Sequence, residues 1–445
     1  MWVEELRIEN IRSFDEETTV VFRHPDDSES PCKWVTFLSE NGGGKSTALQ
    51  ALGLLLAGPE GAQTLLPRPA GWLRDESKPG KISARLRKDL GDPGEFGEKK
   101  VRNAFGYSYA ITGSQHLTIG GKVYTEPTIS PAPQKVLSWL RQNAFPSSGK
   151  GWFAVGYGAF RRLTRSSQII IPSLDPQARY TNFATQFDEA EPLSAFERWL
   201  IYLDYRIAKQ PDKVAEQQLN LGISAINNIL PSHSRFDSVT PEGRIMFNVG
   251  GSRVPTISLS DGYRSILALA GDLVWRLIQA FPESPDPLKE HGVTLIDELD
   301  IHLHPIWQRE IAAKLRELFP NLQFIVATHS PLVAASAGED ALTYRFHFEN
   351  GKSQVERVQN VAAMSVDKIL QSKVFGYVSP YSPQTQTKIE RYDVLLKKGQ
   401  RRSTQENNEY QGLFDFMREA RPIGGPPAPG SLDEKVEQFL GKNLP

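Results

Sequence analysis

The first hydrophobic pattern in the chain predicts a β-rich N-terminal segment that ends in a buried strand. Short apolar and β-branched runs occupy much of the first 38 residues. The run 34–38 (Trp-Val-Thr-Phe-Leu) has no alternating polar face, which is typical of a strand buried on both sides. A polar, glycine-rich segment follows at 39–44, and a helical pattern begins at Ser46. The sequence therefore predicts a strand, a loop and a helix in that order.

The middle of the chain has two different patterns. From about residue 58 to 190, proline and glycine interrupt short strand-like runs, which predicts an antiparallel β-subdomain with loops. From 193 to 230, apolar residues recur at helical spacing, which predicts a helical lobe over 190–262 that ends in a signature motif. Strands are expected at the following positions: 81–86, 104–111, 117–123, 152–157, 244–249 and 256–259.

The C-terminal part continues with alternating helices and strands. The expected elements are a helix over 262–281, a strand over 293–296, a helix over 305–319 and a strand over 324–327. Asn350-Gly351 lies between two β-patterned runs and predicts a hairpin. We expect an ATPase domain over 1–340, a hairpin and helical extension over 341–421, and a Pro/Gly linker with a terminal helix over 422–445.

Composition limits the possible functions. The chain has 445 residues, a net charge of −1 and 39% hydrophobic residues, so it can form a full globular core and has no overall attraction to nucleic acid. Cys32 is its single cysteine, which excludes an intrachain disulfide. No apolar run approaches the roughly 20 residues of a membrane span. We therefore expect a cytoplasmic protein that does not use a membrane.

The strongest candidate site is a phosphate-binding loop between the strand at 34–38 and the next helix. It consists of Asn41, Gly42, Gly43, Gly44, Lys45, Ser46 and Thr47. Small residues allow backbone N–H groups to surround phosphate oxygens, the Lys45 ammonium reaches the β- and γ-phosphates, and the Ser46 hydroxyl binds Mg²⁺. Ser39 stands where such loops usually have their first glycine, a change that affects only the first turn. The flanking strand and helix disfavour the alternative of a chance glycine-rich turn.

Two carboxylates follow the apolar run 293–296. A buried parallel strand that ends there places Asp297 and Glu298 at the C-terminal edge of the sheet, where α/β folds bind ligands. Asp297 would hold the magnesium ion through its water shell, and Glu298 would polarise the attacking water. An apolar strand ending in Asp-Glu is weak evidence for a nucleotide site by itself. The evidence becomes strong when such a strand follows a phosphate loop by about 250 residues.

A second candidate anion site lies at the start of the helix over 262–281. Ser260 and Gly262 belong to the motif 259–265 (Leu-Ser-Asp-Gly-Tyr-Arg-Ser), and the N-terminus of a helix attracts anions. This motif lies in the helical lobe, far along the chain from the first loop. We therefore expect it to serve a second nucleotide across a dimer. An ordinary helix cap at Ser260 is the alternative.

Histidines near the carboxylates are further candidates. His329 follows the strand over 324–327, one strand after the paired carboxylates, and can sense the γ-phosphate by a hydrogen bond. This position favours a sensor over a structural histidine. His302 and His304 have the spacing of metal ligands, but the same spacing starts a helix at Pro305, which we favour.

In chain order, the phosphate loop, signature motif, Asp-Glu strand and His strand resemble the ABC ATPase superfamily. The segments that look like its RecF/OLD-like branch are 8–14, 259–265, 297–305 and 328–331. This branch includes the ATPases of bacterial antiphage systems such as Septu, Gabija and several retrons. The resemblance covers about residues 1–340. It implies an α/β fold, an ABC-ATPase head with a P-loop core sheet, an antiparallel β-subdomain and an inserted helical lobe.

The resemblance also implies a mechanism. ATP and Mg²⁺ would be held by Lys45, Ser46 and Thr47 of one subunit and by Ser260 and Gly262 of the other. Glu298 would direct the water molecule, and His329 would read the γ-phosphate. ATP would close a head-to-tail homodimer, or a higher homo-oligomer, and hydrolysis would open it. The family's glutamine-bearing loop is expected near residues 157–162.

Two features of related ATPases that this sequence lacks limit the kinds of partner that we expect. The long coiled coils of SMC-like proteins are absent between the loop and the signature, and the segment after His329 shows no Asp-x-Asp pair of a Toprim nuclease. We expect a regulatory ATPase of an antiphage complex with a separately encoded effector, such as a nuclease, docked on the tail over 363–445. A RecF-like repair ATPase that binds DNA is one alternative. A transporter subunit is another, but Asp261-Gly262-Tyr263 replaces the Gly-Gly-Gln of transporter signatures.

Overall fold

The computed structural model divides into two compact units, Met1–Ile369 and Leu370–Pro445. The residues that it describes are 1–24, 32–39, 42–88, 92, 104–119, 122–132, 136–146, 151–161, 178–189, 193, 195–372, 375 and 381–420. For 114–119, 122–125, 136 and 418–420 only the backbone is described. Asn41, Arg162 and the predicted linker and terminal helix over 422–445 lie outside this part of the chain.

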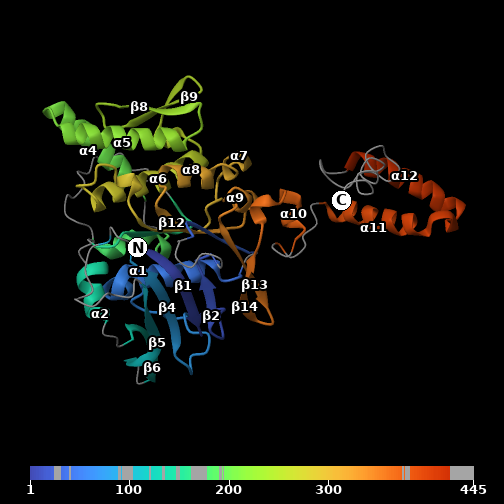
Figure 1. Ribbon diagram of the computed structural model, residues 1–445, viewed down its shortest axis with the longest axis horizontal. Coiled ribbons are helices and arrows are strands. Elements are labelled where there is room, and N and C mark those ends of the chain that lie inside the picture. The colour runs from blue at the N-terminus through green and yellow to red at the C-terminus, as the bar shows by residue number, and fades with distance from the viewer. Residues whose placement is uncertain are drawn as a thin grey trace. The chain divides into compact units, whose positions relative to one another are not determined.

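A six-stranded sheet forms the centre of the first unit, with the strand order β14-β13-β3-β12-β11-β7 (Figure 1). All neighbouring strands are parallel except the antiparallel β13–β14 hairpin. The strands are β3 (Trp34–Leu38), β7 (Ala154–Tyr157), β11 (Gly292–Ile296), β12 (Leu322–Thr328), β13 (Leu342–Glu349) and β14 (Lys352–Val358). Because parallel strands end at the same edge, the segments after β3, β11 and β12 meet there.

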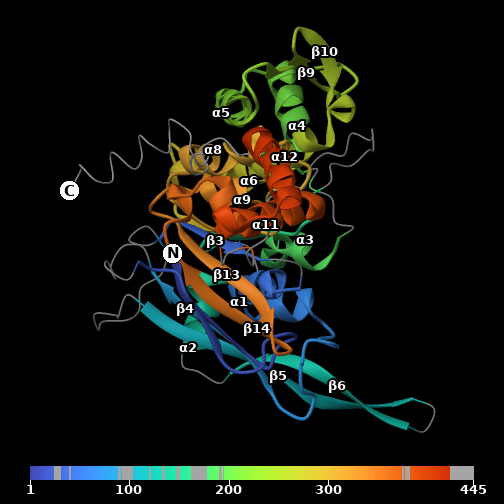
Figure 2. The same cartoon turned by 90° about the vertical axis from the view of Figure 1, so that its right-hand side faces the viewer.

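A five-stranded antiparallel sheet covers one side of this unit, in the order β2-β1-β4-β5-β6. Its strands are β1 (Trp2–Glu9), β2 (Thr18–Val21), β4 (Gly80–Arg87), β5 (Ala104–Ile119) and β6 (Lys122–Pro131). The β5–β6 hairpin extends away from the other strands (Figure 2). The expected single strand over 117–123 is wrong, because it includes the ends of β5 and β6 and the hairpin signal Gly120-Gly121 between them.

Helix α1 (Lys45–Leu65) packs between the two sheets and contacts strands of both. Leu49, Leu52 and Leu55 on this helix are fully buried in a core shared with Leu6 and Phe37. The expected start of loops at residue 58 is wrong. The helix continues through a kink, because Gly58 takes a left-handed φ of 82° and Pro59 cannot donate to the helical ladder.

The helical lobe covers the opposite face of the six-stranded sheet with a second core. Its helices are α4 (Ala195–Lys209), α5 (Lys213–Ile229) and α6 (Asp261–Ala280), and its small sheet has strands β8 (Ser234–Val239), β9 (Ile245–Val249) and β10 (Ser252–Pro255). The helical pattern over 193–230 breaks at Asp212, whose carboxylate caps α5 by accepting from Ala215 N–H at 3.0 Å. The strand expected over 256–259 is instead a 3₁₀ turn, Thr256–Ser258.

Short helices complete the first unit. They are α2 (Val136–Trp139), α3 (Ala184–Phe187), α7 (Pro305–Gln308), α8 (Ile311–Leu318), α9 (Pro331–Ala335) and α10 (Val366–Leu370). The helix expected over 305–319 is thus divided into α7 and α8. The architecture is the predicted α/β fold with a P-loop core sheet, an antiparallel β-subdomain and an inserted helical lobe.

The second unit contains the helical hairpin of α11 (Pro383–Lys398) and α12 (Thr404–Ala420). The Tyr392 and Tyr410 rings stack with centroids 5.2 Å apart, and Arg391 pairs with Glu409 at 2.7 Å. These contacts join the two helices side by side. No helix of the described residues is long and apolar enough to cross a membrane.

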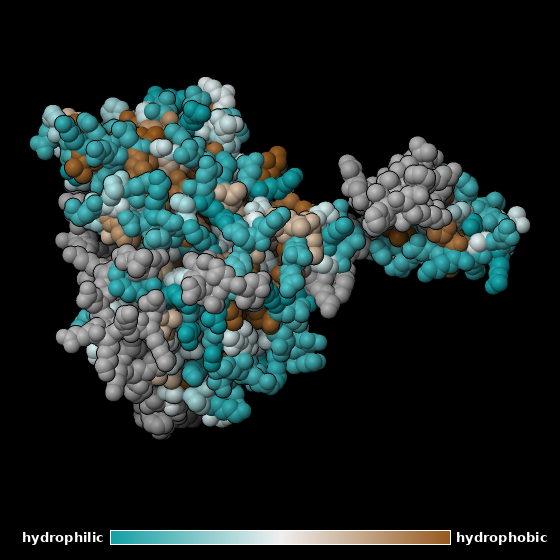
Figure 3. All heavy atoms as spheres, viewed as in Figure 1, coloured by the Kyte–Doolittle hydropathy of each residue, from teal (hydrophilic) through white to brown (hydrophobic). Residues whose placement is uncertain are grey.

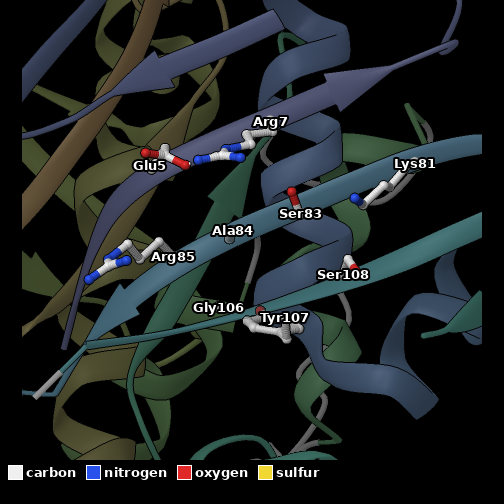
Figure 4. A pocket seen from close by; sticks show the side chains of 9 residues that line it. All are labelled: Glu5, Arg7, Lys81, Ser83, Ala84, Arg85, Gly106, Tyr107 and Ser108. Carbon is white, nitrogen blue, oxygen red and sulfur yellow. Dashed lines mark hydrogen bonds and ion pairs between the residues drawn. The ribbon is translucent and has the colours of Figure 1, made fainter. Parts of the chain in front are cut away.

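A hollow of about 240 Å³ lies on the outer face of the antiparallel sheet (Figure 4). Its lining residues are Glu5, Arg7, Lys81, Ser83, Ala84, Arg85, Gly106, Tyr107 and Ser108. Each cation there has an acidic neighbour: Arg7 has Glu5, Arg85 has Glu4, and Lys81 lies opposite Glu9 in the strand register. These acidic neighbours offset part of the positive charge of the hollow.

Candidate active site

The phosphate loop lies between β3 and α1, as predicted. Gly44 has a φ of 97°, and a Cβ there would lie 2.8 Å from the Phe14 ring, so only glycine fits the last turn before the helix. A Cβ on Gly43 would lie 2.7 Å from the carbonyl oxygen of Phe346. The N-cap position of α1 is Gly44, which has no side chain to cap the helix. The start of α1 therefore offers backbone N–H groups to an anion.

Lys45 is almost fully buried at the carboxyl edge of the sheet. Its ammonium lies 2.8 Å from Ser39 Oγ and 2.8 Å from His329 Nε2. Burial lowers the pKa of Lys45, and the negative charges of Glu298, Asp297 and Asp300 oppose that change. Ser39, the departure from the usual loop pattern, thus supplies a hydroxyl that accepts a hydrogen bond from the lysine.

Asp297 and Ser46 form the second part of the site. Asp297 follows β11 directly and is 9% exposed, and the Ser46 hydroxyl lies beside one oxygen of its carboxylate. Burial raises the pKa of Asp297, and repulsion from Glu298 adds to this increase, while the Ser46 hydroxyl opposes it. The other oxygen, Oδ1, is buried without a hydrogen-bond partner in the described structure. A buried, unpaired carboxylate oxygen beside a hydroxyl fits a magnesium ligand set.

Glu298 and His329 face each other across neighbouring strands. Glu298 Oε1 lies 3.1 Å from His329 Nε2, and Asp300 Oδ1 accepts the His329 backbone N–H at 3.2 Å. Burial acts to raise the pKa of Glu298, but the His329 hydrogen bond and charge, with Lys45 and Arg161, hold that pKa below its ordinary value. The Glu298 carboxylate is therefore ionised at neutral pH.

The signature residues lie at the start of α6. Ser260 is exposed and precedes the helix, and a Cβ on the buried Gly262 would lie 2.6 Å from the His302 carbonyl oxygen. Among the described residues, no hydrogen bond or ion pair joins Ser260 or Gly262 to the phosphate loop or to the carboxylates. The structure thus brings together Lys45, Ser46, Asp297, Glu298 and His329, but leaves the signature residues apart from them.

Two arginines that the sequence did not assign are part of this region. Arg161 lies in the expected 157–162 segment, whose described residues include no glutamine, and its guanidinium donates to the carbonyls of Asp297 and Glu298. Arg12 stacks on Trp72 with 4.4 Å to the ring centroid, and its Nη1 lies 3.5 Å from Thr47 Oγ1. Burial lowers the pKa of Arg12. Only its place in the segment 8–14 marked this arginine in the sequence.

His302 and His304 take the structural role that we favoured. His304 Nδ1 accepts the Ile306 backbone N–H at 3.4 Å and caps α7, with Pro305 in its first turn. His302 has a left-handed φ of 63° and turns the chain ahead of this helix. The two histidines therefore start the helix that follows the carboxylates.

Comparison with known proteins gives relatives from the branch that the sequence resembles. The chain is 32% identical over 194 residues to the "Retron Vc95 probable ATPase" of Vibrio cholerae serotype O1 biovar El Tor, covering 42% of this chain and 36% of that protein. It is 24% identical over 453 residues to the "Septu protein PtuA" of Bacillus mycoides (strain KBAB4), covering 99% of this chain and 54% of that protein. The chain thus spans about half or less of the length of these relatives. The predicted resemblance to Septu and retron ATPases is confirmed.

Solved structures with a similar fold include two SMC heads. The SMC head domain from Thermotoga maritima is 14% identical with a TM-score of 0.41, covering 81% of this chain and all of that one. The SMC head bound to the C-terminal winged-helix domain of ScpA is 16% identical with a TM-score of 0.48, covering 82% and 99%. The family described as "AAA domain, putative AbiEii toxin, Type IV TA system" matches residues 40–335, and this range includes the carboxyl-edge site of Lys45, Ser46, Asp297, Glu298 and His329. The chain belongs to this family of AAA-domain proteins.

Proposed function

We propose that this protein is a magnesium-dependent ATPase of the ABC type that acts as a head-to-tail homodimer. The observation that carries the proposal is the contact chain from Lys45 through His329 to Glu298, at the sheet edge that also holds Ser46 and Asp297. A buried lysine beside a glycine-rich loop, an unpaired carboxylate oxygen and an ionised glutamate are the groups that phosphoryl transfer to water requires.

Each group has a distinct task in the proposed reaction. Lys45 and the N–H groups at the start of α1 bind the terminal phosphates, and Arg12 lies beside Thr47 at the same helix end. Ser46 and Asp297 would hold Mg²⁺, which neutralises charge on the phosphates when bound. Glu298, ionised at neutral pH, orients and polarises the attacking water. His329 Nε2 lies 2.8 Å from the Lys45 ammonium and 3.1 Å from Glu298 Oε1, and with a proton on this nitrogen it can donate to the γ-phosphate.

The signature end of α6 supports the dimer. Ser260 and Gly262 form an anion site with no nucleotide partner in their own subunit, so we assign them to the γ-phosphate of a second copy. Two exposed isoleucines flank this end: Ile257, at 57% exposure, precedes it, and Ile306, at 61% exposure, is in α7. The α7 residue Trp307 packs on Tyr263 with centroids 4.6 Å apart, so α7 and the signature helix share one surface. Burial of these side chains would favour closure of two copies.

On the face shown in Figure 3, the hydrophobic side chains of the described residues appear in scattered groups among polar ones. The relatives named as Septu and retron proteins support a role in antiphage defence. We further propose that the ATPase works there with a separate effector such as a nuclease. We propose that the chain is divided into an ATPase domain over 1–340 and an extension over 341–421. The helical hairpin of α11 and α12 belongs to that extension.

The substitution Glu298→Gln tests the activity. It keeps the size and most hydrogen bonds of the side chain but removes the base, so we expect turnover to fall about 10²- to 10⁴-fold. ATP affinity should remain, because Lys45 and the loop are intact. Lys45→Ala is the matched comparison and should lose ATP binding itself. Wild-type turnover in Glu298→Gln would show that the catalytic carboxylate is assigned wrongly.

A further inference from the structure

Arg161 holds the backbone on both sides of the Glu298 Cα atom. The guanidinium is 6% exposed; its Nη1 donates to the Asp297 carbonyl at 2.6 Å, and its Nη2 donates to the Glu298 carbonyl at 2.7 Å. These two carbonyls belong to the two peptide planes that flank the Glu298 Cα. One rigid, planar side chain therefore restricts both backbone rotations at Glu298 and so fixes the direction in which its side chain leaves the main chain.

The conformation that Arg161 holds is unusual for a glutamate. Glu298 has a left-handed φ of 50°, which side chains with a Cβ rarely adopt. Such a conformation persists only when the surrounding contacts determine it, and it is common at functional sites. The carbonyl contacts of Arg161 contribute to that determination, together with backbone hydrogen bonds from Asp297 to Tyr157 and from Leu299 to Ala327.

Arg161 also connects this backbone to the signature helix. Its Nε donates to Ser265 Oγ of α6 at 3.4 Å, and its Nη1 returns to the Gly158 carbonyl of its own loop at 3.1 Å. One helical turn before Ser265, the same helix begins with the signature residues. A second link joins the loop's strand to α6, because the Tyr157 hydroxyl donates to Asp272 Oδ2 at 2.9 Å.

We propose that Arg161 is a positioning residue: it keeps Glu298 aimed for hydrolysis and couples that aim to the position of α6. This inference rests on the proposed ATPase function. In the dimer, α6 of each subunit caps the nucleotide of the other. A shift of α6 on capping therefore reaches Glu298 of its own subunit through Arg161, and links the two sites.

The test compares Arg161→Lys with Arg179→Lys in the full-length protein. Arg179 is an equally buried arginine whose guanidinium donates to the carbonyls of Leu56 and Trp152, at 2.8 and 2.7 Å, away from the carboxylates. Lysine keeps the charge but cannot span two carbonyls. For Arg161→Lys we expect kcat to fall about 10- to 100-fold with an unchanged Kd for ATP. Arg179→Lys should lower the Tm by about as much as Arg161→Lys does, but it should keep the wild-type kcat. Equal kcat losses in both variants, or an unimpaired Arg161→Lys, would overturn the proposal.

Two further variants keep the test decisive if Arg161→Lys folds poorly. Ser265→Ala removes only the contact with α6, and we expect kcat to fall about 2- to 10-fold with unchanged ATP affinity. An unchanged kcat would reject the coupling. If Arg161 acts through Glu298, adding Arg161→Lys to Glu298→Gln should not lower the residual single-turnover rate further. An additional loss of more than about 10-fold would mean that Arg161 acts by another route.

Failure of this inference can be told apart from failure of the proposed function. If Glu298→Gln hydrolyses ATP at the wild-type rate, the catalytic assignment itself is wrong. If Glu298→Gln is inactive while Arg161→Lys is unimpaired, only the positioning role is wrong.

Discussion

The substitution Asp297→Asn should stabilise the nucleotide-free protein while it abolishes hydrolysis. Asp297 is buried, one carboxylate oxygen has no hydrogen-bond partner in the described structure, and the neighbouring Glu298 repels its charge. Leaving a buried charged acceptor unpaired costs about 1–3 kcal/mol, so a neutral amide should recover a gain of this order. The loss of the metal-binding carboxylate should remove turnover.

The expected change in Tm follows from the size of the first unit. Unfolding entropy of about 2.1 cal/mol/K per residue gives about 0.8 kcal/mol/K for Met1–Ile369, so 1–3 kcal/mol corresponds to a rise of about 1–4 °C. Asp272→Asn is the control. Its carboxylate accepts hydrogen bonds from Tyr157 and from the buried Arg276, so its loss should lower the Tm by about 4–6 °C.

The pH dependence of the Tm gives an independent check on the stabilisation predicted for Asp297→Asn. Because the pKa of Asp297 is raised in the folded protein, folding favours its protonated form. The stability that this group contributes is present below its ordinary pKa and is lost as the pH rises through the raised value. The Tm difference between Asp297→Asn and wild type should therefore be largest at neutral pH and shrink on acidification. A wild-type Tm equal to or above that of the variant at neutral pH, without nucleotide, would refute this reasoning.

Two further predictions concern residues that frame the nucleotide. Arg12→Ala removes an exposed cation beside Thr47 and should weaken ATP binding about 10- to 100-fold in calorimetry, whereas Arg253→Ala, on the outer sheet of the helical lobe, should leave binding unchanged. Gly262→Ala places a Cβ about 2.6 Å from the His302 carbonyl and must displace the start of α6. It should lower kcat about 10-fold or more without changing ATP binding to a single subunit, and wild-type turnover would argue against the signature role.

The carboxyl-edge site could be predicted from the sequence because parallel strands end together. Once β3, β11 and β12 are recognised as buried strands, Lys45, Glu298 and His329 must meet at one edge. The Ser39 contact with Lys45 could not be predicted, because it depends on how the loop turns. The same holds for Arg161, which has an ordinary loop sequence around it and acts on main-chain carbonyls that carry no sequence signal.

The errors in the fold have local causes. Helical periodicity continues across Asp212, so the pattern alone did not separate α4 from α5, although this aspartate is a good helix cap. Proline and glycine at 58–59 indicated the end of a helix, and the backbone does leave helical geometry at Gly58, but a second helical segment follows to Leu65 with Gly61 and Ala62 buried. At Asp212 a local cap interrupts the periodicity, whereas the segment after Gly58 is helical because its buried residues pack into the core.

The central claim is that the two halves of each active site come from different subunits, and a mixing experiment tests it most directly. Lys45→Ala disables the phosphate loop, and Ser260→Arg blocks the exposed signature end with little risk to folding. Each variant alone should be inactive. An equimolar mixture forms hybrid dimers in about half of the assemblies, each with one intact composite site, so about a quarter of wild-type turnover should return. Inactivity of each variant alone and of every mixture, with dimers present, would contradict a shared site.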